Sequence, residues 1–101
     1  MNGDSNNAEK KEEQPGKPLI EYPTVYAFKV IGKQEHGFAE FVKTLFRRLM
    51  GSEISPDSIS ELPSRGNKYI SLTVSVYLLS EEQRQTIYKQ LHQERRILYY
   101  L

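Results

Sequence analysis

At residues 69–78 the chain reads YISLTVSVYL, in which hydroxyl-bearing and aliphatic side chains alternate strictly. Successive side chains of a β-strand point to opposite faces, so this stretch predicts a strand with one polar and one apolar face. The polar face carries Tyr69, Ser71, Thr73, Ser75 and Tyr77. Strands of this kind belong to antiparallel sheets that are covered on one side only. We therefore expect an open sheet.

Two elements precede this strand. Residues 23–31 have the β-branched and aromatic content of a first strand, which Gly32 would close, and Lys29 in its middle belongs on the open face. From Phe38 onward, apolar residues recur at the three- and four-residue spacing of one helical face, which predicts a helix over residues 36–50. Gly51 follows as a C-terminal stop.

The remaining elements are shorter. A second strand is expected at residues 58–62, and Ser64-Arg65-Gly66-Asn67 forms the reversal into the central strand. Ser80 opens a second helix with a capping box, in which its hydroxyl caps the Gln83 amide and the glutamine side chain reaches back. Residues 96–101 are expected to form the last strand.

The element order is therefore strand, helix, strand, strand, helix, strand. This order predicts an α+β, ferredoxin-like βαββαβ sandwich, with both helices on one face of a four-stranded antiparallel sheet. Right-handed crossovers give the strand order 4-1-3-2. Residues 19–101 hold the apolar content of the domain, and the polar residues 1–18 are expected to form a disordered tail.

Three motifs carry a resemblance to a known family. They are Glu21-Tyr22-Pro23-Thr24, Phe28-Lys29-Val30-Ile31-Gly32 and Pro63-Ser64-Arg65-Gly66-Asn67-Lys68-Tyr69. Together they resemble the YbeD-like family of small bacterial proteins of unknown function, over roughly residues 20–101. The resemblance implies a ferredoxin-like fold with the topology of ACT regulatory domains. It brings no established activity and no catalytic residues.

Composition excludes several functions. The chain has no cysteine and a net charge of +1, with 14 basic and 13 acidic residues, so thiol chemistry, cysteine-based metal sites and general affinity for nucleic acids are not expected. His36 and His92 lack the spacing of metal ligands, and Glu81 and Glu82 project in different directions from a helix. We predict a protein that is not an enzyme and binds no cofactor or metal. With no secretory or membrane-spanning pattern, a cytoplasmic location is expected.

The topology brings basic residues from distant segments to one end of the sheet. This predicted basic rim consists of Lys33, His36, Gly37, Arg65, Gly66 and Lys68, with His92, Arg95 and Arg96 expected nearby. Amides of a loop and a helix N-terminus beside such charges could hold a small anionic ligand. The alternative is that these are ordinary solvated loop charges.

The open face is the second candidate. We expect an interaction surface composed of Lys29, Tyr69, Ser71, Thr73, Ser75, Tyr77, Tyr99 and Tyr100. Exposed tyrosines favour protein interfaces, whereas the small hydroxyls in the middle of the strand cannot stack on the bases of single-stranded RNA, which makes nucleic acid an unlikely partner. The sequence thus indicates a small ACT-like binding or regulatory module that self-associates or binds a protein partner, with an anionic ligand at the basic rim. A protein adaptor without ligand is the alternative, single-stranded RNA binding is third, and a monomer with exposed tyrosines is the plain reading of the surface.

Overall fold

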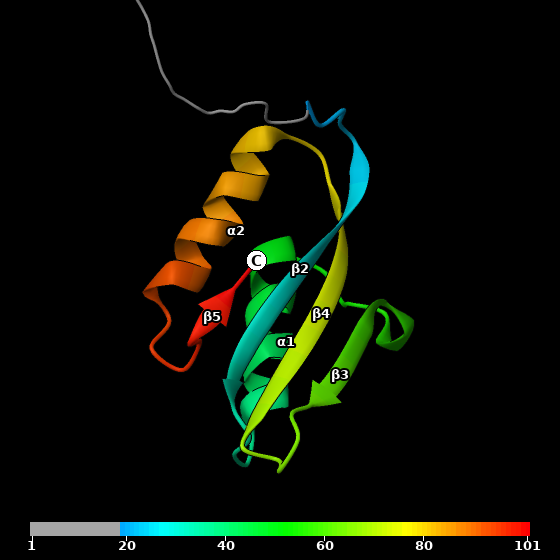
Figure 1. Ribbon diagram of the computed structural model, residues 1–101. Coiled ribbons are helices and arrows are strands. Elements are labelled where there is room, and N and C mark those ends of the chain that lie inside the picture. Colours follow the sequence, from blue (N-terminus) through cyan, green and yellow to red (C-terminus); the bar gives the residue numbers. More distant parts are fainter. Residues whose placement is uncertain (1–18) are drawn as a thin grey trace, which may run out of the picture.

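The computed structural model describes residues 19–101, and the tail expected at residues 1–18 lies outside them. The chain runs from one strand through a helix and a hairpin to a second helix and a last short strand (Figure 1). The elements are β2 (Thr24–Lys33), α1 (Phe38–Met50), the 3-10 turn η1 (Pro56–Ser58), β3 (Ile59–Pro63), β4 (Tyr69–Leu78), α2 (Glu81–Gln93) and β5 (Tyr99–Tyr100).

The four strands form one antiparallel sheet in the order β3-β4-β2-β5, which confirms the predicted ferredoxin-like topology. The two central strands, β2 and β4, pair over ten residues each, from Thr24 opposite Leu78 to Lys33 opposite Tyr69. In Figure 1 they cross in front of α1, so the viewer looks at the uncovered side of the sheet. Both helices lie on the other side.

The core lies between the sheet and the helices. Phe28 of β2 is fully buried and packs against Phe46 of α1 and Tyr88 of α2, with ring centroids 5.7 and 4.9 Å apart. The even-numbered residues of β4 are buried as their alternation predicts, because they share the face of Phe28. The largest fully buried side chains are Phe28, Phe38, Phe46, Leu45, Leu72, Leu78, Ile87, Leu91, Val30, Val42 and Val74.

The helix ends follow local chemistry. Gly51 adopts a left-handed conformation after α1, with φ of 69°, and its N–H donates to the Arg47 carbonyl. The Ser80 hydroxyl accepts from the Gln83 N–H at 3.1 Å, as predicted for the start of α2. The reciprocal half of the capping box was wrong: the Gln83 side-chain oxygen accepts from the N–H of Leu79, at 2.8 Å, rather than from that of Ser80.

Two strand boundaries differ from the expectation. β2 continues through Gly32 to Lys33, because Gly32 is buried and its missing side chain leaves room for the Phe38 ring and the Arg96 carbonyl. β5 contains only Tyr99 and Tyr100, not residues 96–101, because the Ile97 N–H donates to the Glu94 carbonyl in a turn. Backbone bonds from Leu98 to Ile31 and between Leu101 and Lys29 flank this short strand.

Candidate functional site

The open face of the sheet is built from the outward-pointing residues of all four strands. In register, Tyr69, Ser71, Thr73, Ser75 and Tyr77 of β4 stand opposite Lys33, Ile31, Lys29, Ala27 and Val25 of β2. β3 adds Ser60 and Leu62, and β5 adds Tyr99, which is paired with Ile31. Residues opposite each other in an antiparallel pair share a face, so these side chains form one continuous surface.

This face exposes more apolar surface than its hydroxyl row suggests. Leu62 is 68% exposed, Tyr99 63% and Tyr69 41%. A shallow depression of about 230 Å³ lies beside Leu62 and Tyr69, lined by Lys29, Ile31, Leu62, Pro63, Ser64, Tyr69, Ile70 and Ser71. The predicted surface contained Tyr69 but not Ile31 or Leu62, because Leu62 belongs to a short strand whose facing direction the sequence leaves ambiguous.

The charges on the open face have one sign. Lys29 and Lys33 point outward from β2, and none of the outward positions of the four strands carries an acidic residue. Glu61 of β3 points to the helix side, where its carboxylate lies 3.2 Å from Lys43 Nζ of α1. The open face therefore combines exposed apolar side chains with positive charge.

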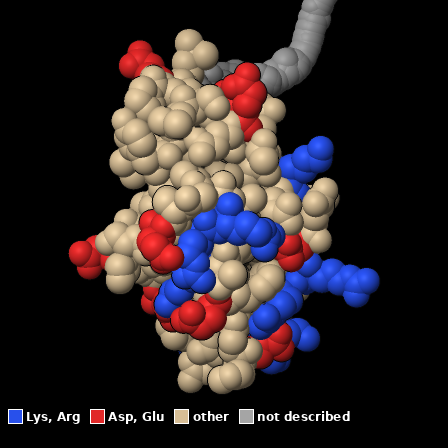
Figure 2. Space-filling view, turned by 180° about the vertical axis from the view of Figure 1, so that it is seen from behind, with Lys and Arg blue, Asp and Glu red and all other residues tan. Residues whose placement is uncertain are grey.

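The helix side differs in charge pattern. Seen from behind, basic and acidic side chains are intermingled (Figure 2). Lys43 lies 3.7 Å from Glu40 within α1, and Arg47 lies 3.5 Å from Glu53. Exposed pairs of this kind balance each other and contribute little to stability, so this side has no field of one sign to attract a charged partner.

The two consecutive tyrosines of β5, Tyr99 and Tyr100, point to opposite faces of the sheet. Tyr99 lies on the open face as expected, but Tyr100 does not belong to that surface, because it pairs with the inward-pointing Val30. Its ring packs 5.9 Å from that of Tyr88, and its hydroxyl hydrogen bonds His92 Nδ1 at 3.0 Å. Tyr100 is therefore part of the packing under α2.

The basic rim is partly assembled. Lys33 stands opposite Tyr69, and the Gln34 N–H donates to the Lys68 carbonyl at 2.9 Å, so the ends of β2 and of the hairpin are joined. Gly66 and Asn67 have positive φ angles, as the predicted reversal requires. All six predicted rim residues, Lys33, His36, Gly37, Arg65, Gly66 and Lys68, are exposed. An anion site here stays a prediction.

Two of the basic residues expected near this rim have other contacts. Arg96 donates to the His36 carbonyl at 3.5 Å and lies over the rings of Phe38 and Phe41, at 5.6 and 4.8 Å from their centroids. His92 lies exposed in the last turn of α2, where its Nδ1 is 3.0 Å from the Tyr100 hydroxyl. Arg96 thus joins the rim to the core, whereas His92 joins the end of α2 to β5.

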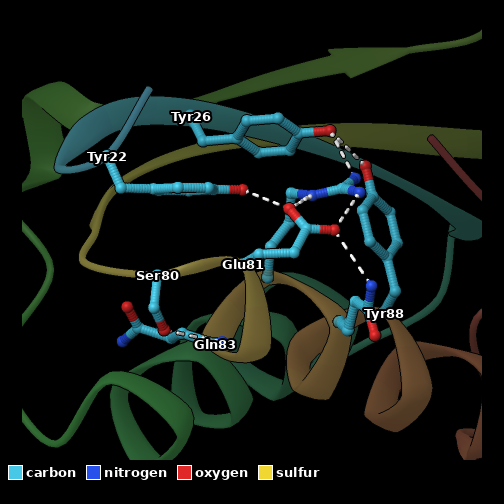
Figure 3. A network of polar contacts seen from close by, with 8 residues as sticks. Tyr22, Tyr26, Ser80, Glu81, Gln83 and Tyr88 are labelled. Carbon is cyan, nitrogen blue, oxygen red and sulfur yellow. Dashed lines mark hydrogen bonds and ion pairs between the residues drawn. The ribbon is translucent and has the colours of Figure 1, made fainter. Parts of the chain in front are cut away.

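A cluster of polar residues that the sequence did not predict ties β2 to α2 (Figure 3). We call this cluster, composed of Tyr22, Tyr26, Glu81, Arg84 and Tyr88, the polar clasp. Arg84 donates to both carboxylate oxygens of Glu81, at 3.0 and 2.7 Å, and to the Tyr26 hydroxyl at 3.3 Å. Tyr22 donates to Glu81 at 2.6 Å, and the hydroxyls of Tyr26 and Tyr88 are 2.9 Å apart.

The charged groups of the polar clasp, Arg84 and Glu81, are held in place by hydrogen bonds and by contacts with aromatic rings. The Arg84 side chain is 14% exposed and lies over the rings of Tyr26 and Tyr88, at 5.7 and 5.5 Å from their centroids. Hydrogen bonds from Arg84, then Tyr22, lower the pKa of Glu81 to about 2, and burial raises the pKa of Tyr88. The guanidinium, the carboxylate and the three hydroxyls are hydrogen bonded to one another, so we interpret the clasp as structural.

Residues 19–101 contain no group of three or more His, Asp or Glu side chains placed to hold a metal ion. Among the described helices, neither is long and apolar enough to cross a bilayer.

Comparison with known proteins places the fold in context. Residues 17–101 match the family model described as "Protein of unknown function (DUF493)". A UPF0250 protein of Bordetella pertussis is 38% identical over 80 residues, covering 77% of this chain and 85% of the relative. A UPF0250 protein of Hahella chejuensis is 41% identical over 71 residues, covering 70% and 77%. The solution structure of protein HP0495 from H. pylori aligns with a TM-score of 0.62 at 22% identity, over 90% of this chain and 98% of that one.

Proposed function

The chain belongs to the DUF493 family of proteins of unknown function, the UPF0250 or YbeD-like proteins, and because that family brings no assigned activity we propose a function from the surface of the fold. We propose that the protein is a non-enzymatic binding module whose open face takes a protein partner. The partner surface carries acidic side chains around apolar ones.

The single observation that carries this proposal is the composition of the open face. Apolar side chains surround the depression beside Lys29, and the only charges at outward strand positions are lysines. Burial of exposed apolar surface contributes roughly 25 cal/mol per Å², and lysines without acidic neighbours attract a partner of opposite charge. The hydroxyls of Ser71, Thr73 and Ser75 add short donors and acceptors across a flat surface.

Self-association through the same face is the competing candidate, and the charges disfavour it. A two-fold symmetric dimer places the same patch on both sides of the interface, so the lysines of both copies would enter one interface that offers them no acidic side chain at an outward strand position. Like charges brought together in an interface are costly. The sheet face is therefore better suited to a different, acidic protein than to a second copy.

The experiment compares the native chain with two single charge reversals. Lys29→Glu changes the open face, and Lys89→Glu reverses an exposed lysine of α2 as the matched control. Each protein is immobilised and exposed to extract of the source cell, and captured proteins are identified and their affinities measured by titration. We expect a partner that binds the native chain and K89E equally and K29E at least about tenfold more weakly, with affinity falling as salt rises.

Two outcomes would contradict the proposal. The first is a partner whose affinity for K29E equals that for the native chain. The second is a concentration-dependent dimer of the native chain in sedimentation that K29E disrupts, since this would show that the open face binds a second copy.

A further inference from the structure

One row of outward-pointing side chains crosses all four strands of the open face. The register pairs Leu62 of β3 with Ser71 of β4, and Ser71 with Ile31 of β2. Ile31 in turn is paired with Tyr99 of β5. We call these four residues the cross-strand row. Neighbouring strands of a sheet lie about 4.8 Å apart, so the row is about 14 Å long from Leu62 to Tyr99.

Ser71 leaves a notch in the cross-strand row, whose other members are aliphatic or aromatic. Its side chain is the shortest of the four, and its hydroxyl donates to the Leu62 carbonyl at 3.4 Å. The depression of about 230 Å³ is lined by Ser71 together with Ile31 and Leu62. The two ends of the row, Leu62 and Tyr99, are 68% and 63% exposed. A partner can therefore insert a large apolar side chain over Ser71 and contact both ends.

The two lysines of β2 lie on either side of this row. Lys29 and Lys33 come two residues before and two residues after Ile31, so all three side chains point to the open face. Two residues of an antiparallel strand span about 7 Å, which places one lysine about 7 Å to each side of the row. Both lysines are exposed, and no outward position of the four described strands is acidic. The open face thus carries an apolar stripe with positive charge along both sides.

Building on the proposed function, we propose that the cross-strand row binds an amphipathic α-helix of another protein. The helix lies across the strands and carries acidic residues on both flanks of its apolar face. It rises about 1.5 Å per residue, so roughly ten residues cover the row, and its turns of about 5.4 Å nearly match the spacing of the strands. With side chains a helix is about 10–12 Å wide, so residues on its flanks reach lysines about 7 Å from its axis.

A helix suits this face better than an extended segment does. The backbone groups of a helix are hydrogen bonded to one another, whereas an extended segment needs partners for its N–H and C=O groups. The backbone groups of a sheet lie in its plane, and at Ser71 and Ile31 the strands are paired on both sides. The face therefore offers a bound segment side chains but no backbone partners.

A different protein must supply this helix. Both helices of the described residues, α1 and α2, bury their own apolar residues in the core, so a second copy presents no helix with a free apolar stripe. Residues 1–18 hold only Met1 and Ala8 as apolar side chains, which cannot form a stripe about ten residues long. The lysines attract a helix whose flanks are acidic.

The first experiment selects displayed peptides on the immobilised full chain. One library has helix-forming residues over about fourteen positions and varies one face and its two flanks, and a second holds random peptides of about eight residues without helical pattern. Enriched peptides from the first library should carry large apolar residues at three- and four-residue spacing, with Asp or Glu on both flanks. A proline placed in the middle should weaken their binding at least about 100-fold. The proposal is overturned if the first library yields no such binders, or if proline has no effect.

The second experiment maps an enriched helical peptide onto the row by titration. Leu62→Ser and Tyr99→Ser each shorten one end of the row and should weaken binding at least about tenfold. Their controls are Leu79→Ser and Tyr77→Ser, because Leu79 and Tyr77 are 65% and 56% exposed and lie outside the row. The control substitutions should change affinity less than about twofold. Equal losses for row and control variants would overturn the proposal.

The third experiment tests the two flanks separately by exchanging charges. Lys29→Glu and Lys33→Glu should each weaken peptide binding at least about tenfold, whereas Lys89→Glu on α2 should leave it unchanged. Replacing the acidic residues by lysine on one flank of the peptide should restore binding to K29E, and on the other flank to K33E. The helix does not lie between the two lysines if either reversal leaves affinity unchanged, or if the same flank restores both variants.

Failure of the helix and failure of the proposed function give different results. A cellular partner that K29E weakens, but whose binding segment is not helical or is unaffected by L62S, overturns the helix and leaves the proposed function standing. If the captured partners bind K29E as tightly as the native chain, the open face is not the binding surface and both proposals fall.

Discussion

Gly32 should be the residue of β2 least tolerant of a single added methyl group. A Cβ atom placed there would lie 2.3 Å from Cζ of Phe38 and 2.8 Å from the Arg96 carbonyl oxygen. Carbon atoms in contact prefer about 3.5–4.0 Å, so the ring must shift by more than an ångström. Phe38 is 1% exposed and is covered by Arg96, which leaves its ring nowhere to turn.

The expected cost of Gly32→Ala follows from this crowding. Overpacking a core costs about 1–3 kcal/mol. Because Gly32→Ala creates two simultaneous clashes, one of them with backbone, it should lower the free energy of unfolding by about 3 kcal/mol. Domains of this size have a free energy of unfolding of roughly 5–10 kcal/mol. With a urea dependence of about 1 kcal/mol per molar, the unfolding midpoint should fall by about 3 M.

The assay is urea unfolding of a double-mutant cycle with Phe38→Leu, which removes the ring atoms nearest to the new methyl group. In this background Gly32→Ala should cost at least about 1 kcal/mol less, because only the clash with the Arg96 carbonyl remains. Gly66→Ala is the control: Gly66 has φ of 83° and no atom near its Cβ position, so its cost of about 1 kcal/mol should be the same in both backgrounds. A cost of Gly32→Ala below about 1 kcal/mol, or one that Phe38→Leu does not change, would refute the reasoning.

Three further predictions concern α2. Because the folded-state pKa of Glu81, about 2, lies below its ordinary value of 4.5, its carboxylate stabilises the fold above pH 4.5 and that stabilisation is lost as the pH falls toward 2. Glu81→Gln should therefore flatten this part of the acid dependence of the urea midpoint, and an unchanged acid slope would contradict the assignment. Arg84→Lys should lose about 1–2 kcal/mol in urea unfolding, because lysine cannot reproduce the two-pronged contact with the carboxylate, whereas the exposed Lys89→Met should change stability by less than about 0.5 kcal/mol. Ser80→Ala should lose about 1 kcal/mol by the same measurement and speed exchange of the Gln83 amide, and normal exchange there would count against the cap.

The architecture could be predicted from the sequence because its signals are local and periodic. The alternation at residues 69–78 and the helical spacing from Phe38 are each contained in one element, and both match the structure. The strand order followed from rules of connection rather than from particular contacts. The short β5 was not predicted, because Ile97 and Leu98 have the composition of a strand and only the turn at Glu94 shows where pairing begins.

The surface could be predicted only in part. The open face was placed correctly through the hydroxyl row of β4, whereas Tyr100 was misassigned because two consecutive tyrosines give no phase. The polar clasp joins residues up to 62 positions apart, and only its local pair, Glu81 and Arg84, has a spacing that could have been recognised.

The sheet is wide at one end and narrow at the other. Near Lys29 and Ile31 it is four strands wide, but within residues 19–101 only β2 and β4 extend to Thr24 and Leu78. A two-stranded ribbon alone is only marginally stable, so this end depends on α2 and the clasp to stay closed. On heating, β2 and β4 should therefore separate first near Thr24 and Leu78 and last near the hairpin that joins β3 to β4. A third strand paired with the narrow end would stabilise it against local unfolding and reverse that order of melting.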